Sequence, residues 1–336
     1  MVRYEQPCAG DPGVDAAPRV SVVIPCFKVR RHVLGVLASM PDWVSDIYCV
    51  DDACPEGSGD FIEQHCDDPR VHVLRHRENQ GVGGATLTGY REAAADGAAV
   101  VVKVDGDGQM DPALLPLFIA PILRGEADYC KGNRFWNLGE IKQMPWLRRV
   151  GNLGLSFLSK ASTGYWDVFD PTNGFTAIHG NIVSRLPVES ISKRYFFETD
   201  MLFRLNAMRA VVVDVPMDAK YGDEVSNLRI SQVLGEFALK HARNFAKRIL
   251  YRYYLRDLSI ASLELLASIL LLGGGLAFGF FHWVIALRTG VSTPTGTVVL
   301  PALAIISGLQ FLLAFLGYDI ASVPRRPIHP SLIRIR

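Results

Sequence analysis

Two carboxylates and one amide occupy alternate positions in a single short segment of this chain. Asp105, Asp107 and Gln109 follow an apolar, β-branched run at residues 99–104. A run of this kind that ends in glycines is typical of a strand buried on both faces, with its polar residues at its C-terminal end. Oxygen ligands at this spacing suit a hard divalent cation and leave positions open for phosphate and water. The segment is therefore a candidate site for a metal-bound nucleotide.

The alternative is a solvated turn that only caps the helix after it. Asp111-Pro112 already provides that helix with an N-cap and a first-turn proline. The side chains of Asp105 and Asp107 are surplus to this local role, which favours the metal site.

The elements that must position these residues alternate between strands and helices. Predicted strands cover residues 20–25, 44–52, 71–74, 99–104, 128–132 and 211–215, with a further candidate at 175–179. Helical patterns between the strands indicate an α/β fold with a mostly parallel sheet and helices on both faces. Ligands of such sheets bind beyond the carboxyl ends of the strands. Asp51, Asp52, Asp105 and Asp107 all fall at such ends.

The overall composition disfavours some classes of function. The net charge of the 336-residue chain is +1, so no global field favours nucleic acid. The cysteines form no CxxC pair and no cluster with histidine at metal-binding spacing, and we expect free thiols in a reducing cytosol. Residues 1–18 contain no apolar core of a signal peptide, so we expect a poorly ordered tail and no cleaved signal.

The C-terminal third has the composition of a membrane protein. In residues 230–254 apolar residues recur at helical spacing and basic residues gather on other faces, which indicates a helix on an anionic membrane surface. Residues 258–287 and 297–318 are each long and apolar enough to cross a bilayer. We therefore predict a basic amphipathic interfacial helix at 229–257 and a two-helix transmembrane hairpin at 258–318.

The distribution of basic residues predicts the orientation of this hairpin. Arginines and lysines precede the first span and four arginines follow the second, at residues 319–336, whereas the loop between the spans contains only Arg288. The more basic side faces the cytoplasm, so we expect both termini and residues 19–228 to be cytoplasmic. Glu264, near the start of the first span, has either an interfacial position or a polar partner.

Seven motifs together resemble a known family. They are, in chain order, VSVVIPCF, VDDACPEGS, NQGVGGA, VDGDGQMDP, KGNRF, DPTNGF and YFFETD. Their order resembles that of inverting family-two glycosyltransferases with the A-type fold, over about residues 20–228. The position of Gln109 and the C-terminal hairpin are similar to the polyisoprenyl-phosphate glycosyltransferases, the dolichol-phosphate mannose synthase-like group that includes bacterial undecaprenyl-phosphate glucosyl enzymes. The resemblance implies a nucleotide-diphospho-sugar transferase (GT-A type) domain at residues 19–228.

The resemblance also implies a nucleotide site at the ends of the strands. The residues expected to bind the nucleotide are Pro25, Phe27, Asp51, Asp52, Asp105, Arg134 and Lys220. The first two match the base pocket, the two aspartates after them match contacts to base and ribose, and Arg134 matches an arginine that binds pyrophosphate. Lys220 falls, with Tyr221 and Ser226, where the family has a mobile acceptor loop, although GDEVS is longer than the family's GES sequence.

A metal site and a catalytic set follow from the same resemblance. Asp105, Asp107 and Gln109 would bind Mg²⁺ or Mn²⁺, which neutralises the charge that builds on a leaving diphosphate. Arg148, with Asn152, matches residues that meet the phosphate of a lipid acceptor. The catalytic candidates are Asp107, Arg134, Arg148 and Asp200.

The role of Asp200 depends on the acceptor. Many family-two enzymes use a carboxylate at this position as general base, because a sugar hydroxyl must lose a proton. A lipid phosphate is already ionised at neutral pH, and then Asp200 and Glu198 would orient the acceptor or its cationic partners. A structural alternative is that both acids only stabilise the dipole of a helix that begins there. Asp170, before Pro171, is likewise either a turn residue or part of the substrate pocket.

The leading hypothesis is a membrane-anchored inverting enzyme that moves a sugar from a UDP- or GDP-sugar to undecaprenyl or dolichyl phosphate on the cytoplasmic leaflet. The first alternative is a membrane-tethered family-two enzyme that acts on a glycan hydroxyl. The second is a non-catalytic nucleotide-binding scaffold in the membrane. We expect no nucleic-acid partner, and small residues at Gly273-Gly274-Gly275 suggest a homo-oligomer formed by packing of the transmembrane helices.

Overall fold

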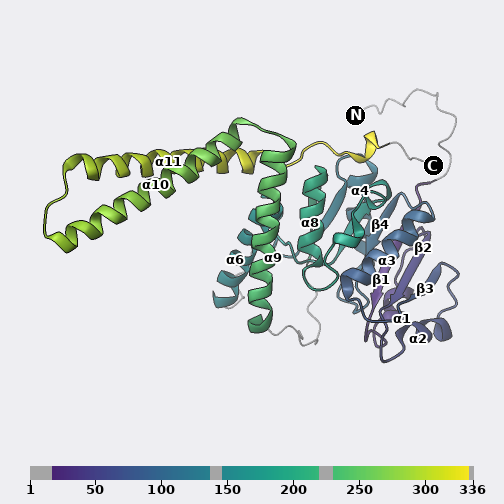
Figure 1. Ribbon diagram of the computed structural model, residues 1–336. Helices are drawn as coiled ribbons and strands as arrows, with labels where there is room; N and C mark the ends of the chain where they lie inside the picture. The colour runs from purple at the N-terminus through teal and green to yellow at the C-terminus, as the bar shows by residue number, and fades with distance from the viewer. Residues whose placement is uncertain (1–16, 137–145, 219–229, 333–336) are drawn as a thin grey trace, which may run out of the picture.

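The computed structural model describes residues 17–136, 146–218 and 230–332. A β-sheet covered by helices forms the larger part, and a pair of long helices extends away from it (Figure 1). Lys220, Tyr221 and Ser226 lie outside the described residues, as does the predicted tail at 1–18 except for its last two positions.

The described part of the chain contains a seven-stranded sheet. Its strands are β1 (Val20–Cys26), β2 (Asp46–Asp51), β3 (Val71–Arg75), β4 (Val100–Lys103), β5 (Tyr129–Asn133), β6 (Thr176–His179) and β7 (Val212–Pro216). Their order is β3-β2-β1-β4-β6-β5-β7. β6 is antiparallel to β4 and β5, and the other neighbouring pairs are parallel. The prediction of an α/β fold with a mostly parallel sheet is confirmed, and the candidate strand at 175–179 is β6.

Helices cover both faces of this sheet. The helices of the sheet domain are α1 (Val33–Ala38), α2 (Ser58–His65), α3 (Val82–Ala95), α4 (Leu115–Leu123), α6 (Trp146–Thr163), α7 (Gly180–Val183) and α8 (Phe197–Met208). Val22 and Ile24 of β1 share one hydrophobic core with α1, α2 and α4, whereas Val23 shares the other with α3, α7 and α8. Since successive side chains of a strand point to opposite faces, one apolar run builds both cores.

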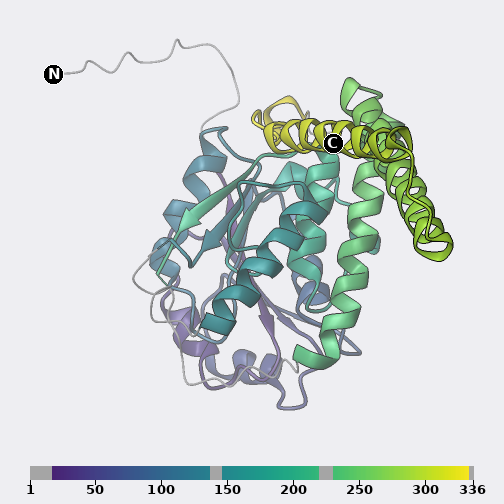
Figure 2. The same cartoon turned by 90° about the vertical axis from the view of Figure 1, so that its left-hand side faces the viewer.

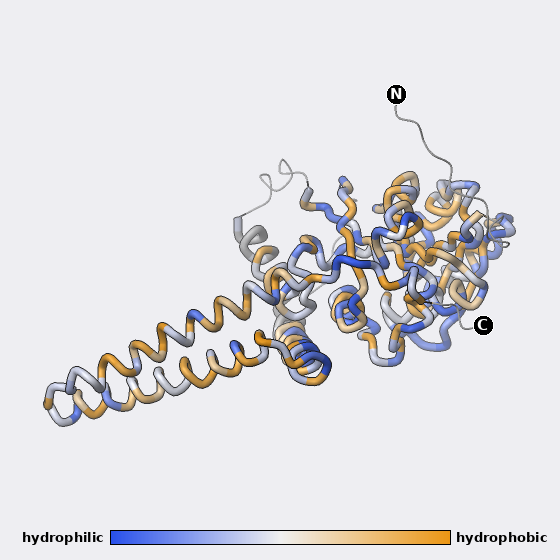
Figure 3. The backbone as a smooth tube through the Cα atoms, turned by 90° about the horizontal axis from the view of Figure 1, so that it is seen from above, coloured by the Kyte–Doolittle hydropathy of each residue, from blue (hydrophilic) through white to orange (hydrophobic). Residues whose placement is uncertain are grey.

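Two long apolar helices follow, α10 (Ile260–Thr289) and α11 (Thr295–Ala321). Figure 3 shows them as a largely hydrophobic pair that leaves the rest of the protein. Only 22% and 17% of their most apolar windows are buried, whereas a core helix of a soluble protein is mostly buried. Both helices are long and apolar enough to cross a membrane, which suggests membrane anchoring.

The two long helices pack on each other through their small residues. An added Cβ at Gly275 would lie 3.1 Å from the carbonyl oxygen of Pro301, and one at Gly308 would lie 2.9 Å from the backbone nitrogen of Leu272. Gly275 therefore serves the contact within the hairpin, while Gly273 has no atom within 4 Å of such a Cβ. Association between copies of the chain remains a prediction.

Two amphipathic helices lie between the sheet and the hairpin. α6 and α9 (Ile230–Leu250) run side by side, and the hairpin leaves crosswise from the C-terminal end of α9 (Figures 1 and 2). Their exposed large apolar side chains are Trp146, Leu153, Phe157, Leu158, Leu239, Phe245 and Leu250. A π-helix, η3 (Tyr251–Arg256), connects α9 to the hairpin. This arrangement gives the sheet domain an exposed apolar face beside the hairpin.

One buried carboxylate fastens the hairpin to the sheet domain. Asp319 in α11 is 1% exposed and accepts hydrogen bonds from both Nη atoms of Arg248, at 2.6 and 3.0 Å. Tyr253 Oη and Trp166 Nε1 donate to the same carboxylate at 2.6 and 2.8 Å. We call these four side chains the hairpin-root cluster. Further along, Asp128 accepts bonds from the backbone nitrogens of Ile328 and His329, which returns the chain to the sheet.

Candidate active site

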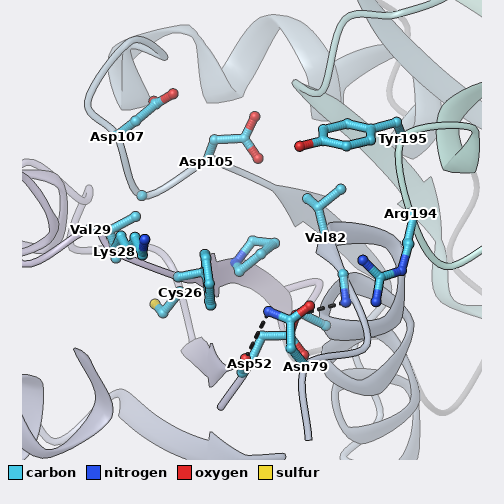
Figure 4. Close-up of a pocket in the computed structure, with 15 residues that line it drawn as sticks. Cys26, Lys28, Val29, Asp52, Asn79, Val82, Asp105, Asp107, Arg194 and Tyr195 are labelled. Carbon is cyan, nitrogen blue, oxygen red and sulfur yellow. Dashed lines mark hydrogen bonds between the residues drawn. The ribbon is translucent and has the colours of Figure 1, made fainter. Parts of the chain in front are cut away.

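A pocket of about 660 Å³ lies beyond the carboxyl ends of β1, β2 and β4. Of the predicted nucleotide and metal residues, the pocket is lined by Pro25, Phe27, Asp52, Asp105 and Asp107. Figure 4 shows Asp105 and Asp107 projecting from one loop, with Arg194 and Tyr195 on another wall. Arg194 and Tyr195 belong to the segment before α8, where Tyr195 begins the YFFETD motif, and neither was predicted as a nucleotide-binding residue. We call this cavity the donor pocket.

Asp105 is held by a buried lysine. Lys103, 1% exposed, donates from Nζ to Asp105 Oδ1 at 2.6 Å and to the Gly174 carbonyl oxygen at 3.2 Å. Burial by itself lowers the pKa of Lys103, but the charges of Asp105 and Glu198 outweigh it and raise that pKa. Lys103 therefore stays cationic beneath the pocket, where it forms an ion pair with Asp105.

The turn after β4 determines where Asp107 points. Asp107 Oδ1 accepts from the backbone nitrogen of Gln109 at 3.0 Å. Gly108 has φ +79°, a conformation that side-chain-bearing residues rarely adopt. Gln109 is partly buried and is not among the lining residues of the donor pocket.

The carboxylates of Asp105 and Asp107 could hold a hard cation only together with oxygens from a bound substrate and from water. Among the described residues, no three His, Cys, Asp or Glu side chains are grouped to hold a metal ion. Asp105 and Asp107 supply carboxylate oxygens in the pocket, and Lys103 already neutralises part of that charge. A cation here would need phosphate oxygens and water to complete its shell, which is how Mg²⁺ commonly binds beside nucleotides.

The two adjacent aspartates at the end of β2 have different surroundings. Both carboxylate oxygens of Asp51 accept backbone N–H groups, from Cys54 at 2.7 Å and Gly59 at 2.6 Å. Asp51 therefore organises the start of α2 and does not line the donor pocket. Asp52 does line it, and its oxygens accept from the backbone nitrogens of Gln80 and Gly81 at 2.8 and 2.7 Å.

Arg134 is oriented by Asp170. Its Nε donates to Asp170 Oδ2 at 2.8 Å and its Nη2 to Asp170 Oδ1 at 3.2 Å. Burial would raise the pKa of Asp170, but the hydrogen bond and charge of Arg134 lower it. Asp170 is fully buried while 34% of the Arg134 side chain is exposed, so a fixed anion holds a cation that reaches solvent. Arg134 is not among the residues that line the donor pocket.

Glu198 lies near the buried lysines, whereas Asp200 does not. Glu198 Oε1 is 4.0 Å from Lys103 Nζ, and burial raises the pKa of Glu198 although Lys103 and Lys131 oppose that shift. Burial also lowers the pKa of Lys131 to about 8. These lysines were missed as site residues, although a single charge inside an apolar strand is a visible signal of a buried ion pair.

Asp200 holds two other segments together. Its Oδ2 accepts from the backbone nitrogen of Ser192 at 2.8 Å, and its Oδ1 accepts from Asn244 Nδ2 of α9 at 3.0 Å. Asp200 is 6% exposed and does not line the donor pocket. Ser192 lies two residues before Arg194, so this hydrogen bond connects Asp200 to the segment that forms the pocket wall.

Two predicted residues can be placed only along the backbone. Arg148 and Asn152 lie in the first half of α6, the helix beside α9, and their side chains are not among those described. Lys220 and its loop fall outside the described residues.

The chain resembles known proteins in sequence over much of its length. The family model described as glycosyl transferase family 2 matches residues 21–186. The chain is similar to an undecaprenyl-phosphate mannosyltransferase of Micrococcus luteus, at 31% identity over 59% of this chain and 82% of that protein. It is also similar to UDP-N-acetylglucosamine–dolichyl-phosphate N-acetylglucosaminyltransferase of Methanococcus voltae, at 28% identity over 66% of this chain and 92% of that one.

A solved structure supports the architecture. The crystal structure of mannosyl-3-phosphoglycerate synthase from Rubrobacter xylanophilus matches with a TM-score of 0.51 at 17% identity, covering 72% of this chain and 77% of that one. At this identity the likeness concerns the fold, which is the GT-A α/β fold.

Proposed function

The chain belongs to glycosyl transferase family 2, and from this membership we propose that it transfers a sugar from a UDP- or GDP-sugar to polyprenyl phosphate. The acceptor would be undecaprenyl or dolichyl phosphate in the cytoplasmic leaflet, and the anomeric configuration would invert. One observation carries the proposal: a pocket lined by the carboxylates of Asp105 and Asp107 belongs to the same chain as two exposed apolar helices. The names of two relatives, which contain undecaprenyl phosphate and dolichyl phosphate, support the acceptor class.

The donor pocket would hold the nucleotide sugar. Pro25 and Phe27 would contact the base, and Asp52 would meet the ribose while its backbone partners keep it in place. Asp51 is a weaker candidate because it does not line the donor pocket, whereas Asp52 does. Arg194 would bind the diphosphate as a cation, since it lines the pocket on a different wall from Asp105 (Figure 4).

The reaction would exchange one C–O bond for another. An oxygen of the acceptor phosphate attacks the anomeric carbon from the face opposite the diphosphate, and the bond to the diphosphate oxygen breaks. Asp105, Asp107 and Gln109 are the residues that would hold Mg²⁺ or Mn²⁺, which would stabilise negative charge on the departing diphosphate. Lys103 pairs with Asp105 from beneath the pocket, and Asp170 keeps Arg134 oriented for a phosphate group.

No general base is needed for a phosphate acceptor. A phosphate oxygen is already ionised at neutral pH, so no proton has to leave before attack. The buried position of Asp200, bonded to Ser192 and Asn244, agrees with a positioning role. A hydroxyl acceptor would instead require a carboxylate within about 2.6–3.2 Å of the attacking oxygen.

The acceptor would approach along the face made by α6 and α9. This face carries exposed apolar side chains beside the hairpin, so a lipid could keep its tail in the bilayer while its phosphate reaches the pocket. Arg148, near the start of α6, is the proposed cation for that phosphate. The interfacial role of α9 and the cytoplasmic side of both termini belong to this proposal.

The direct test is product formation by the purified full chain. The protein in detergent is incubated with labelled UDP- or GDP-sugars, Mg²⁺ or Mn²⁺, and undecaprenyl phosphate. We expect label to enter a chloroform-soluble product in the presence of cation and acceptor together. Failure of every common donor to give such a product would refute the lipid acceptor.

The Asp200→Asn variant separates the two acceptor classes. If a phosphate is the acceptor, the variant should keep measurable transfer. In that case the Asp200 carboxylate helps to position the pocket wall and removes no proton from the acceptor. If a glycan hydroxyl is the acceptor, removing the base should lower the rate by about 100-fold or more. Thermal unfolding of the variant serves as the control for a misfolded protein.

A further inference from the structure

A second cavity, of about 170 Å³, lies at the root of the hairpin. Its lining includes Arg209 at the end of α8, Arg252 and Arg256 of η3, and Ser322 just after α11. Its described lining residues share no member with those of the donor pocket. The cavity is therefore a separate feature that transfer chemistry does not use.

The cavity has more positive than negative charge. Three arginines line it, and Asp257 is the carboxylate among its lining residues. The neighbouring Asp319 offsets only part of this excess, because both its oxygens accept from Arg248 and its Oδ1 lies 3.8 Å from Arg252 Nη1. Two positive charges in the cavity thus lack a carboxylate of their own among the described lining residues.

Arg252 is the clearest sign of a missing anion. Its Nη1 is buried with no hydrogen-bond partner in the described part of the chain, and it lies 3.8 Å from Asp319 Oδ1. Only 13% of the Arg252 side chain is exposed. Burial lowers the pKa of Arg252, which means that the cationic form is incompletely compensated there. An anion in the cavity would supply negative charge beside Arg252.

Capping of α11 explains only part of the cluster. Arg209 Nη1 and Arg252 Nη2 donate to the Ser322 carbonyl oxygen at 3.0 and 2.6 Å, as cations do at helix C-termini. Arg256 does not cap α11, since its Nη1 donates to the Ala207 carbonyl oxygen at 2.7 Å. Arg209 also has φ +66°, where glycine is the favoured residue.

The position of the cavity matches the headgroup level of a bilayer. It lies between the residues before α10 and those after α11, so both helices of the hairpin leave from it in the same direction. Leu255, Leu258 and Ile260 around it are 66%, 71% and 70% exposed. Arginines beside exposed apolar side chains at a membrane boundary suit an anionic lipid, whose phosphate and acyl chains need both.

We propose that this cavity binds the phosphate of an anionic phospholipid through Arg209, Arg252 and Arg256. The lipid would join η3 and the end of α11 at the membrane surface. It would thereby stabilise the junction between the hairpin and the sheet domain without taking part in transfer.

The test measures the thermal unfolding midpoint of the full chain in neutral detergent, with no sugar nucleotide added. Dihexanoyl phosphatidylglycerol, dihexanoyl phosphatidylcholine or inorganic phosphate is titrated in parallel. We expect phosphatidylglycerol to raise the midpoint saturably and phosphatidylcholine to leave it unchanged. Arg256→Gln should increase the half-effective lipid concentration by about tenfold, the loss of one charge-assisted hydrogen bond.

Two matched variants distinguish the cavity from general surface charge. Arg243→Gln removes the same charge from an exposed position of α9, outside the cavity, and should leave the titration unchanged. Arg256→Lys should recover part of the affinity. Equal responses of Arg256→Gln and Arg243→Gln, or equal effects of the two lipids, would overturn the site. An equal effect of inorganic phosphate would overturn the lipid as its ligand.

Discussion

The hairpin root and the donor pocket each contain a buried or half-buried carboxylate, but the two carboxylates differ in their hydrogen-bond partners and in their exposure. At the root, Asp319 is 1% exposed and accepts four hydrogen bonds from Arg248, Tyr253 and Trp166. At the pocket, Asp105 is 29% exposed, with Lys103 bonded to Oδ1 and the pocket in front. The first carboxylate is enclosed by protein groups, and the second faces space that a ligand can fill.

This difference shows how to separate structural acids from ligand-binding acids. A carboxylate enclosed by donors from distant elements fixes those elements to each other, and its removal leaves a buried cation without a partner. A carboxylate that faces a pocket is stabilised by protein on one side only, so its charge remains available to a ligand. The predictions below test whether the two regions divide in this way.

The largest expected effect is at the hairpin root. Asp319→Asn should destabilise the protein by about 3–5 kcal/mol, because Arg248 would be left buried without its ion pair. Chemical denaturation of the purified protein in detergent measures the change. Asp257→Asn, an exposed acid of the same junction, is the control and should change stability by less than about 0.5 kcal/mol. Comparable losses in both variants would contradict the distinction.

At the donor pocket we expect lost activity with kept stability. Asp107→Asn should reduce transfer by more than about 100-fold, because charge stabilisation of several kcal/mol would be lost from the leaving group. The unfolding free energy should stay within about 0.5 kcal/mol of the parent protein. The control is Asp67→Asn, at an exposed acid in the loop before β3, which should change neither transfer nor stability. A strongly destabilised Asp107→Asn would place this residue with Asp319.

Gln109 tests how far the pocket's donor set extends. Gln109→Leu should raise the concentration of Mg²⁺ or Mn²⁺ needed for half-maximal transfer by about tenfold, because an amide oxygen would be removed from the metal shell. Gln109→Glu should keep a ligand oxygen and lose much less. A metal titration unchanged by Gln109→Leu would exclude the side chain from the site.

Asp214 of β7 is intermediate between the two regions and gives the smallest effect. Its Oδ2 accepts from the backbone nitrogen of Phe169 at 2.8 Å, but its Oδ1 is buried without a partner in the described part of the chain. Burial raises the pKa of Asp214 from 3.8 to about 6. The protonated form is thus favoured on folding, and its stabilisation is full below pH 3.8 and lost as the pH rises through 6.

Lowering the pH from 7.5 to 5.5 should therefore increase the contribution of Asp214 to stability by about 1 kcal/mol. The difference in unfolding free energy between the parent protein and Asp214→Asn, measured at both pH values, isolates this contribution. The same difference at both values would show that Asp214 is ionised in the fold at pH 5.5.

The sequence was sufficient to predict the strands and helices. It was insufficient to predict which groups each acidic side chain contacts. Runs such as 99–104 predicted buried strands and the aspartates at their ends, and the long apolar segments predicted α10 and α11. Asp51 was expected at the pocket with Asp52, but it does not line the pocket, and its oxygens accept from Cys54 and Gly59 at the start of α2. Adjacent residues of a strand point to opposite faces, and a motif cannot tell which of two neighbouring aspartates turns toward a ligand.

Local pattern by itself determined the strands, the amphipathic helix and the apolar hairpin, because periodicity and hydrophobicity act over a few residues. Only the tertiary structure decided that Asp200 binds Asn244 of α9, that Lys103 supports Asp105, and that Glu198 lies nearer to the pocket's lysines. It also decided the root of the hairpin, where Trp166 and Asp319 meet across 153 positions of the chain. Burial and charge pairing depend on such long-range contacts, which no short segment encodes.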